Sequence, residues 1–213
     1  LRKRAFERNS YAILRIKTEL AYNALKPWQV LQGLYALAFI FALASLFVKH
    51  SFIKFSPIAI SAFAILLHVS SLTARVFILE RPPVGSLYES LLFVSLISSI
   101  FAFLGWYRFK ERLFLIAGLF IALFLLLIAP VFAPKGDSLE MLVAVLNTHF
   151  WLATHVIIIT AGYAFCVLTA CLAHIALFRR GFARTPDLVF EKKIDLFLFA
   201  SLFFTCFGTV LGG

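Results

Sequence analysis

Two short stretches of this chain carry most of its candidate functional side chains. The first runs from Arg81 to Ser90 and reads Arg-Pro-Pro-Val-Gly-Ser-Leu-Tyr-Glu-Ser, a polar turn followed by the start of an apolar run. Its carboxylate, Glu89, stands one turn inside that apolar run, next to Tyr88. A charged side chain within a bilayer costs about 3 kcal/mol unless it is paired. Glu89 therefore requires a specific partner.

Arg75 is the partner that the spacing predicts for Glu89. It lies seven residues before Pro82, and Glu89 lies seven residues after Pro82. If the turn is a tight hairpin, both side chains reach the same depth in the bundle. We therefore predict an ion pair between Arg75 and Glu89 that ties the two flanking helices together. A purely structural role for this pair remains open beside a functional one.

His68 lies near the centre of the apolar run that precedes the turn. Ser61, Ser71 and Arg75 lie seven, three and seven residues away from it, so the four side chains share one helix face. Within a bilayer, a polar stripe of this kind faces the interior of a helix bundle rather than lipid. The pattern therefore predicts that His68 is buried.

The second stretch, residues 149–156, begins a later apolar run and places His155 about five residues inside it. Trp151 precedes His155 by one helical turn, and Gly162 follows it by two turns. An imidazole between an aromatic ring and a glycine leaves a flat recess beside a ligating nitrogen, which suits a haem held through an axial histidine. The alternative, a hydrogen-bonded histidine near the membrane interface, remains open.

The composition predicts a membrane protein. The chain is 62% hydrophobic and 14% charged and contains 26 Phe, far from the balance of a soluble domain. Apolar runs of about 20 residues are long enough to cross a bilayer. We predict an all-α, polytopic helical membrane protein with a basic amphipathic juxtamembrane segment, residues 1–27, and a transmembrane domain, residues 28–213. About six spans are expected, near 28–48, 55–79, 85–107, 113–133, 150–178 and from about 194 onward.

Several functional classes lack their motifs in this sequence. It contains no phosphate-binding glycine loop, no His-Glu-x-x-His and no nucleophile elbow, so hydrolase or nucleotide chemistry is not encoded here. The three cysteines lie in apolar runs without a Cys-x-x-Cys pair, which argues against a disulfide framework or a dithiol relay. The net charge of +10 lies mainly between spans, where membrane topology explains it. No nucleic-acid partner is expected.

Basic residues also set the expected orientation. Lys49, Lys54, the 108–112 turn and the 179–193 loop fall on one side of the membrane, which the positive-inside bias assigns to the cytoplasm. The 80–86 turn, the 134–149 loop and the C-terminal end then face outward. The basic N-terminal tail also falls on the outer side. That position is tolerated if the tail continues from a large exported domain, since long segments translocate largely regardless of charge.

Together the two stretches resemble the CcsA (ResC) family of cytochrome c biogenesis proteins. The segment from His68 through Arg75 to Ser90 resembles the family's His…Arg…Arg-Pro-Pro-x-Ser-Asn-x-Tyr-Glu-Ser signature. It departs from that signature at Gly85 and Ser86, where Ser-Asn is more usual.

Three further segments extend the resemblance over essentially the whole chain. Residues 151–164 resemble the family's Trp-x-x-x-His-Val…Ser-Tyr-Ala segment, and residues 208–213 resemble those just before its tryptophan-rich haem-handling loop. Residues 19–23 resemble the junction of fused CcsBA forms. We therefore expect this chain to be the CcsA part of a longer polypeptide. The tryptophan-rich loop and the family's later histidines would lie in the remainder.

The resemblance implies a function, a cofactor and partners. Haem b is expected at an outward-facing site held by two external histidines, of which His155 matches the first, with Trp151 and Gly162 beside it. Two thioether bonds would form to the Cys-x-x-Cys-His motif of apocytochrome c, the activity of a holocytochrome c synthase of the haem lyase type. The implied partners are apocytochrome c, a CcsB (ResB) portion and membrane lipid. The implied location is the bacterial inner (plasma) membrane, with the outward side facing the periplasm.

Two other interpretations of the polar residues remain open. A multi-pass transporter or channel would line its pathway with His68, Arg75 and Glu89. A structural subunit of a larger membrane complex would use the same residues only to hold its helices together. The sequence leaves open whether His68 binds haem.

Overall fold

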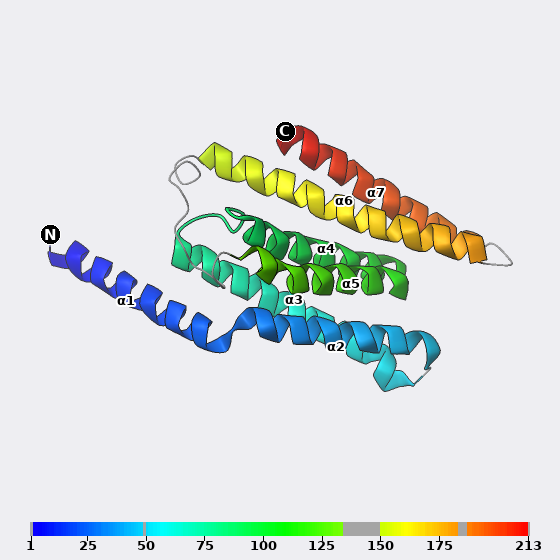
Figure 1. Cartoon of the computed structure of the whole chain (residues 1–213), viewed down its shortest axis with the longest axis horizontal. Helices are drawn as coiled ribbons and strands as arrows, with labels where there is room; N and C mark the ends of the chain where they lie inside the picture. The colour runs from blue at the N-terminus through cyan, green and yellow to red at the C-terminus, as the bar shows by residue number, and fades with distance from the viewer. Residues whose placement is uncertain (1, 49, 134–149, 183–186, 213) are drawn as a thin grey trace.

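The computed structural model is a bundle of long helices (Figure 1). It describes residues 2–48, 50–133, 150–182 and 187–212, and for residues 2–10 and 150–153 it describes the helical backbone alone. The predicted all-α fold is confirmed, because this part of the chain contains helices and no strand. The helices are α1 (Arg2–Leu25), α2 (Pro27–Phe47), α3 (Ser51–Leu79), α4 (Leu87–Phe109), α5 (Arg112–Ile128), the 3-10 helix η1 (Ala129–Phe132), α6 (Phe150–Phe182) and α7 (Leu188–Gly212).

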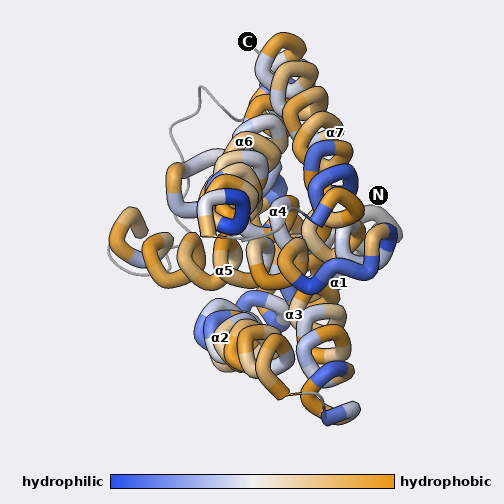
Figure 2. The backbone as a smooth tube through the Cα atoms, turned by 90° about the vertical axis from the view of Figure 1, so that its right-hand side faces the viewer, coloured by the Kyte–Doolittle hydropathy of each residue, from blue (hydrophilic) through white to orange (hydrophobic). Residues whose placement is uncertain are grey.

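Six of these segments are long and apolar enough to cross a membrane, as predicted. Their bounds differ from the predicted ones by a few residues, and the fourth span ends in η1 rather than in a regular α-helix. α1 is not among the six, and it forms the predicted N-terminal helix. Figure 2 shows apolar residues on all sides of the bundle, as expected where the outer helix faces meet lipid. Predictions about Lys49, Arg184, the 134–149 loop and Gly213 lie outside the described residues.

Local sequence signals explain where the helices begin and end. α2 starts with Pro27 at its first turn, where a missing N–H costs nothing. The preceding residue, Lys26, has a left-handed backbone with φ 43° that breaks the path between α1 and α2. α3 ends at Leu79, and its C-cap residue, Glu80, is also left-handed and lies two positions before the first proline. The side chain of Ser86 then accepts the Glu89 N–H at 3.2 Å and caps α4.

The helices pack mainly as three hairpins of consecutive elements, α2–α3, α4–α5 and α6–α7. The α4–α5 hairpin lies between the others, since α2 packs against α5 and α6 packs against both α4 and α5. One cluster of buried apolar residues extends over α1 to α5, and a second joins α4 and α5 to α6 and α7. The bundle therefore has two apolar interiors separated by the α4–α5 hairpin.

Three glycines bring α6 and α7 into backbone contact. A Cβ built on Gly208 would lie 2.8 Å from the Cα of Gly162, and one built on Gly212 would lie 2.7 Å from the N of Ile159. Close approach of this kind is how small residues promote helix association in membranes. We call this contact the glycine seam, formed by Gly162, Gly208 and Gly212.

Different elements meet at the two ends of the bundle. The start of α2, the 80–86 turn, η1, the start of α6 and the end of α7 lie at one end, on the left in Figure 1. We call this the Glu89 end, and α1 extends away from it. The opposite end, which we call the basic end, carries the turn at 109–112 and the facing ends of α6 and α7.

Candidate functional site

The polar site at the Glu89 end is built around one buried carboxylate. The predicted ion pair is confirmed: Arg75 Nη2 lies 3.1 Å from Glu89 Oε1, and both side chains are 1% exposed. A second guanidinium reaches the same carboxylate, with Arg81 Nη1 2.9 Å from Oε2 and Nη2 3.0 Å from Oε1. The backbone N–H of Gly85 donates to Oε2 at 3.0 Å. We call Arg75, Arg81 and Glu89 the carboxylate lock.

The turn conformation explains why Arg81 joins the lock. The left-handed Glu80 reverses the chain after α3, and the capped start of α4 fixes the position of Glu89. Arg81 lies between them and forms a two-point bond with both carboxylate oxygens, the geometry that a guanidinium favours. Two cations against one anion leave the lock with a net positive charge. The lock therefore fixes the turn and also creates a local positive field.

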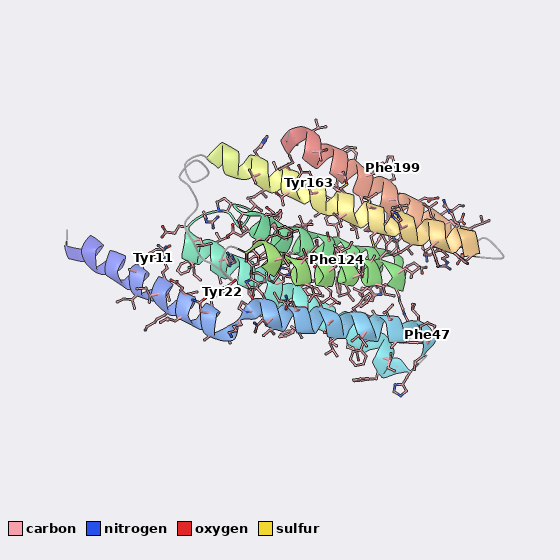
Figure 3. All side chains as sticks on the ribbon, in the orientation of Figure 1. Tyr11, Tyr22, Phe47, Phe124, Tyr163 and Phe199 are labelled. Atoms are coloured by element: carbon pink, nitrogen blue, oxygen red, sulfur yellow. The ribbon has the colours of Figure 1, made fainter. Side chains whose placement is uncertain are left out.

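Arg75 also connects the lock to α1. Its Nη1 donates to the hydroxyl of Tyr22 at 3.4 Å, and its guanidinium lies 5.4 Å from the centre of the Tyr88 ring. Tyr22 belongs to α1 and is labelled beside the α1–α2 junction in Figure 3. Both tyrosines are almost completely buried. The N-terminal helix is thus joined to the membrane bundle through the same arginine that pairs with Glu89.

His68 is buried inside the bundle, as predicted, with no exposed surface. Its Nδ1 lies 3.2 Å from the hydroxyl of Tyr35, and that hydroxyl lies 3.2 Å from Ser99 Oγ. The Trp28 ring meets the imidazole edge to face at 5.6 Å. Among the described residues, Nε2 makes no hydrogen bond of normal geometry, although the backbone of Leu92 interacts with the ring.

The lock and His68 form one connected group of side chains. Tyr22, which accepts from Arg75, lies 6.3 Å from the Trp28 ring, and Trp28 in turn packs on His68. The sequence predicted the stripe on α3 but not the three aromatic residues that complete the group. Trp28 and Tyr35 lie seven residues apart and therefore share a face of α2. This spacing was the sequence signal that could have predicted that both face the same neighbour.

His155 lies on the first part of α6, toward the Glu89 end, and its side chain is exposed. In the described part of the chain its ring makes no hydrogen bond or ion pair. The side chain of Trp151 lies outside the described residues, so the proposed stack over His155 stays a prediction. The described residues contain no cluster of three or more metal-ligating side chains. An exposed imidazole on an apolar helix fits a single axial ligand to haem iron.

The prediction that Gly162 leaves an open recess below His155 was wrong. The space where its side chain would be is filled by the backbone of α7, 3.1 Å away at Gly208 and Thr209. A glycine within a membrane helix either exposes backbone or allows another helix to approach, and here the second case holds. The close packing of α6 against α7 in the glycine seam therefore explains why position 162 is a glycine.

The sequence matches no protein-family model and no curated protein.

Proposed function

We propose that this chain takes part in cytochrome c maturation, as the CcsA-like portion of a synthase that presents haem b at the outer face of the membrane. The observation that carries the proposal is the position of His155. Its exposed imidazole belongs to the part of α6 at the Glu89 end, where the Arg81–Glu89 turn also lies. Two of the segments on which the resemblance rests thus have their polar residues at one end of the bundle.

In this proposal His155 would hold haem through an imidazole nitrogen. Bound haem would supply vinyl groups to which the two thiols of an apocytochrome c Cys-x-x-Cys-His motif add. The contribution of this chain is to fix the position and tilt of the ring system, so catalysis would be mainly positioning. The carboxylate lock supports this role by holding the α3–α4 turn rigid. Apocytochrome c and a CcsB portion are the proposed partners.

The proposed orientation has the Glu89 end facing the periplasm of a bacterial inner membrane. Its support is the set of basic residues next to the span ends at the other end. Arg108, Lys110 and Arg112 lie at the turn between α4 and α5, and Lys192 and Lys193 lie near the start of α7. Basic residues close to span ends favour the cytoplasmic side. The basic α1 lies at the Glu89 end, and long segments outside the membrane translocate largely regardless of charge.

An absorbance spectrum of the purified chain in mild detergent tests the haem proposal. We expect a Soret band that His155→Ala removes or shifts, because the axial nitrogen is lost, and that added imidazole partly restores. His174→Ala is the matched control, since His174 is an exposed histidine of the same helix whose Nδ1 lies 2.7 Å from the Ala170 carbonyl oxygen. An unchanged Soret band in His155→Ala, or an equal loss in His174→Ala, would contradict the assignment.

The second candidate is a transporter or channel that uses His68, Arg75 and Glu89. It is favoured by the connected group of buried polar side chains that runs from the lock to His68. His68, Arg75 and Glu89 are 0% to 1% exposed, so transport would require the helices to separate. Solute flux into liposomes by a haem-free preparation would favour this candidate over the first.

A further inference from the structure

Tyr22 and Tyr88, which contact Arg75, also line a recess at the Glu89 end. The recess has a volume of about 360 Å³ and lies where the start of α2, the start of α4 and η1 converge. Neither the carboxylate lock nor His155 lines it. It is therefore a separate feature from the sites that the proposed function uses.

The recess combines an aromatic floor with a polar rim. Its three aromatic residues, Tyr22, Trp28 and Tyr88, are 4% to 6% exposed. Its rim includes Asn23, Lys26 and Gln29, all exposed, and the lining contains no carboxylate. Amide and ammonium groups on a rim donate hydrogen bonds, and aromatic rings pack against apolar groups. This combination selects a ligand with acceptor oxygens next to an apolar part.

The electrostatic field of the recess favours an anion. Lys26 supplies one positive charge to its rim, and no carboxylate lines it. The lock behind Tyr22 and Tyr88 carries two guanidinium groups against one carboxylate. Both charged contributions are positive. The ligand is therefore expected to carry a carboxylate or phosphate group.

An apolar groove meets the recess at Tyr22. It has a volume of about 280 Å³ and runs between α1, α2 and α3. Leu25, Val30, Leu67 and Ala74 supply most of its apolar lining, and the hydroxyls along it belong to Thr18, Tyr22, Ser70 and Ser71. Thr18, Ser70 and Ser71 each donate a hydrogen bond to a carbonyl of their own helix. The Tyr22 hydroxyl accepts a hydrogen bond from Arg75. The groove therefore suits a hydrocarbon chain.

We propose that the recess and the groove together bind an anionic phospholipid. Its phosphate is held by Lys26 with Asn23 and Gln29, and one acyl chain lies in the groove beyond Tyr22. Lys26 directly precedes the first apolar span, the level at which lipid headgroups lie. Basic pockets between membrane helices bind acidic headgroups in this way. The site goes beyond the proposed function and does not require haem.

The backbone at Lys26 permits a clean test. Its φ of 43° is left-handed, and asparagine adopts that conformation more readily than most residues. Lys26→Asn therefore removes the charge without straining the junction. Lys110→Asn is the matched control, because Lys110 is also an exposed lysine with a left-handed φ of 58° and lies at the basic end. Lys26→Arg keeps the charge.

The experiment is native mass spectrometry of the delipidated full chain, titrated with phosphatidylglycerol, phosphatidylcholine or inorganic phosphate. We expect phosphatidylglycerol to bind more tightly than phosphatidylcholine. Lys26→Asn should weaken phosphatidylglycerol binding about tenfold, the effect of one charge-assisted hydrogen bond. Lys26→Arg and Lys110→Asn should bind as the parent does. If Lys26→Asn does not fold, Gln29→Leu, inside α2, tests the same rim and should bind about threefold more weakly.

Three results would overturn the proposal. Equal binding of phosphatidylglycerol and phosphatidylcholine would show that the negative charge of the headgroup does not contribute to binding. An equal loss in Lys26→Asn and Lys110→Asn would assign the effect to overall charge. Competition by inorganic phosphate at the concentration of the lipid would show that the recess recognises a free anion, with no contribution from the groove.

Discussion

Arg75 and Glu89 meet at 3.1 Å across the α3–α4 turn, and each side chain is 1% exposed. Removal of two charges from water is costly, and their attraction offsets that cost only where the remaining hydrogen-bonding positions are also filled. Here Arg81 and the N–H of Gly85 complete the shell of the carboxylate. The stability of the buried ion pair therefore depends on the groups that the turn supplies, and the conformation of the turn depends in return on its contacts with Glu89.

Loss of the charge on Glu89 should destabilise the bundle. In Glu89→Gln the buried guanidinium of Arg75 and the partly exposed one of Arg81 lose their counter-charge, and breaking one side of a buried pair costs about 3 kcal/mol. We expect the variant to unfold at a clearly lower mole fraction of sodium dodecyl sulfate in mixed micelles, followed by far-ultraviolet circular dichroism.

Glu80→Gln is the control for this prediction. Glu80 pairs with Arg15 at 3.3 Å, but the two side chains are 53% and 41% exposed. An exposed pair contributes about 0.5 kcal/mol or less, so the unfolding midpoint should hardly move. Equal midpoints for Glu89→Gln and the parent would show that the lock does not stabilise the fold.

Substitution in the glycine seam should separate α6 from α7. The methyl group of Gly208→Ala would lie 2.8 Å from the Cα of Gly162, and backbone atoms cannot rotate away as a side chain can. Forcing the helices apart should cost about 2 kcal/mol. The same mixed-micelle unfolding measurement detects this loss.

Gly33→Ala tests whether the loss comes from the seam. Gly33 is also a glycine within a membrane helix, and nothing lies within 4 Å of the position its Cβ would take. We expect no loss of stability, because alanine has the higher helix propensity by about 1 kcal/mol. A similar loss in both variants would rule out the close contact as its cause.

The proposed orientation can be tested with two cysteine variants at matched positions. Glu80 and Lys110 are both exposed residues with left-handed backbones that follow a membrane helix, one at each end of the bundle. In a chain without its native cysteines, Glu80→Cys should react with a membrane-impermeant maleimide in intact cells. Lys110→Cys should react only after the membrane is permeabilised. The reverse pattern would place the Glu89 end in the cytoplasm.

The sequence was sufficient to predict the membrane helices and the ion pair between Arg75 and Glu89 in the carboxylate lock. Proline, charge and run length mark the ends of membrane spans, because each acts locally. The Arg75–Glu89 pair followed from the equal sequence distances of both residues from Pro82, since a hairpin of regular helices converts sequence spacing into depth. The burial of His68 followed from helical periodicity in the same way.

Contacts that depend on a loop or on a distant helix could not be predicted. Arg81 joins Glu89 because Glu80 adopts a left-handed conformation, which its residue type does not favour. Tyr22 reaches Arg75 from a helix 53 positions earlier in the chain, a distance over which sequence periodicity carries no information. Gly162 was expected to leave space for a ligand, and the sequence could not show that α7 fills that space.

The order of the three hairpins bears on how the chain is made. Each hairpin joins consecutive helices, so it can form as soon as its second helix leaves the ribosome. The α4–α5 surface is already synthesised when α6 and α7 emerge, so α6 and α7 can pack onto one side of it while α2 and α3 already occupy the other. No hairpin has to be inserted between two that are already in place. Biosynthesis can therefore build this bundle by successive addition, from the N-terminal hairpin outward.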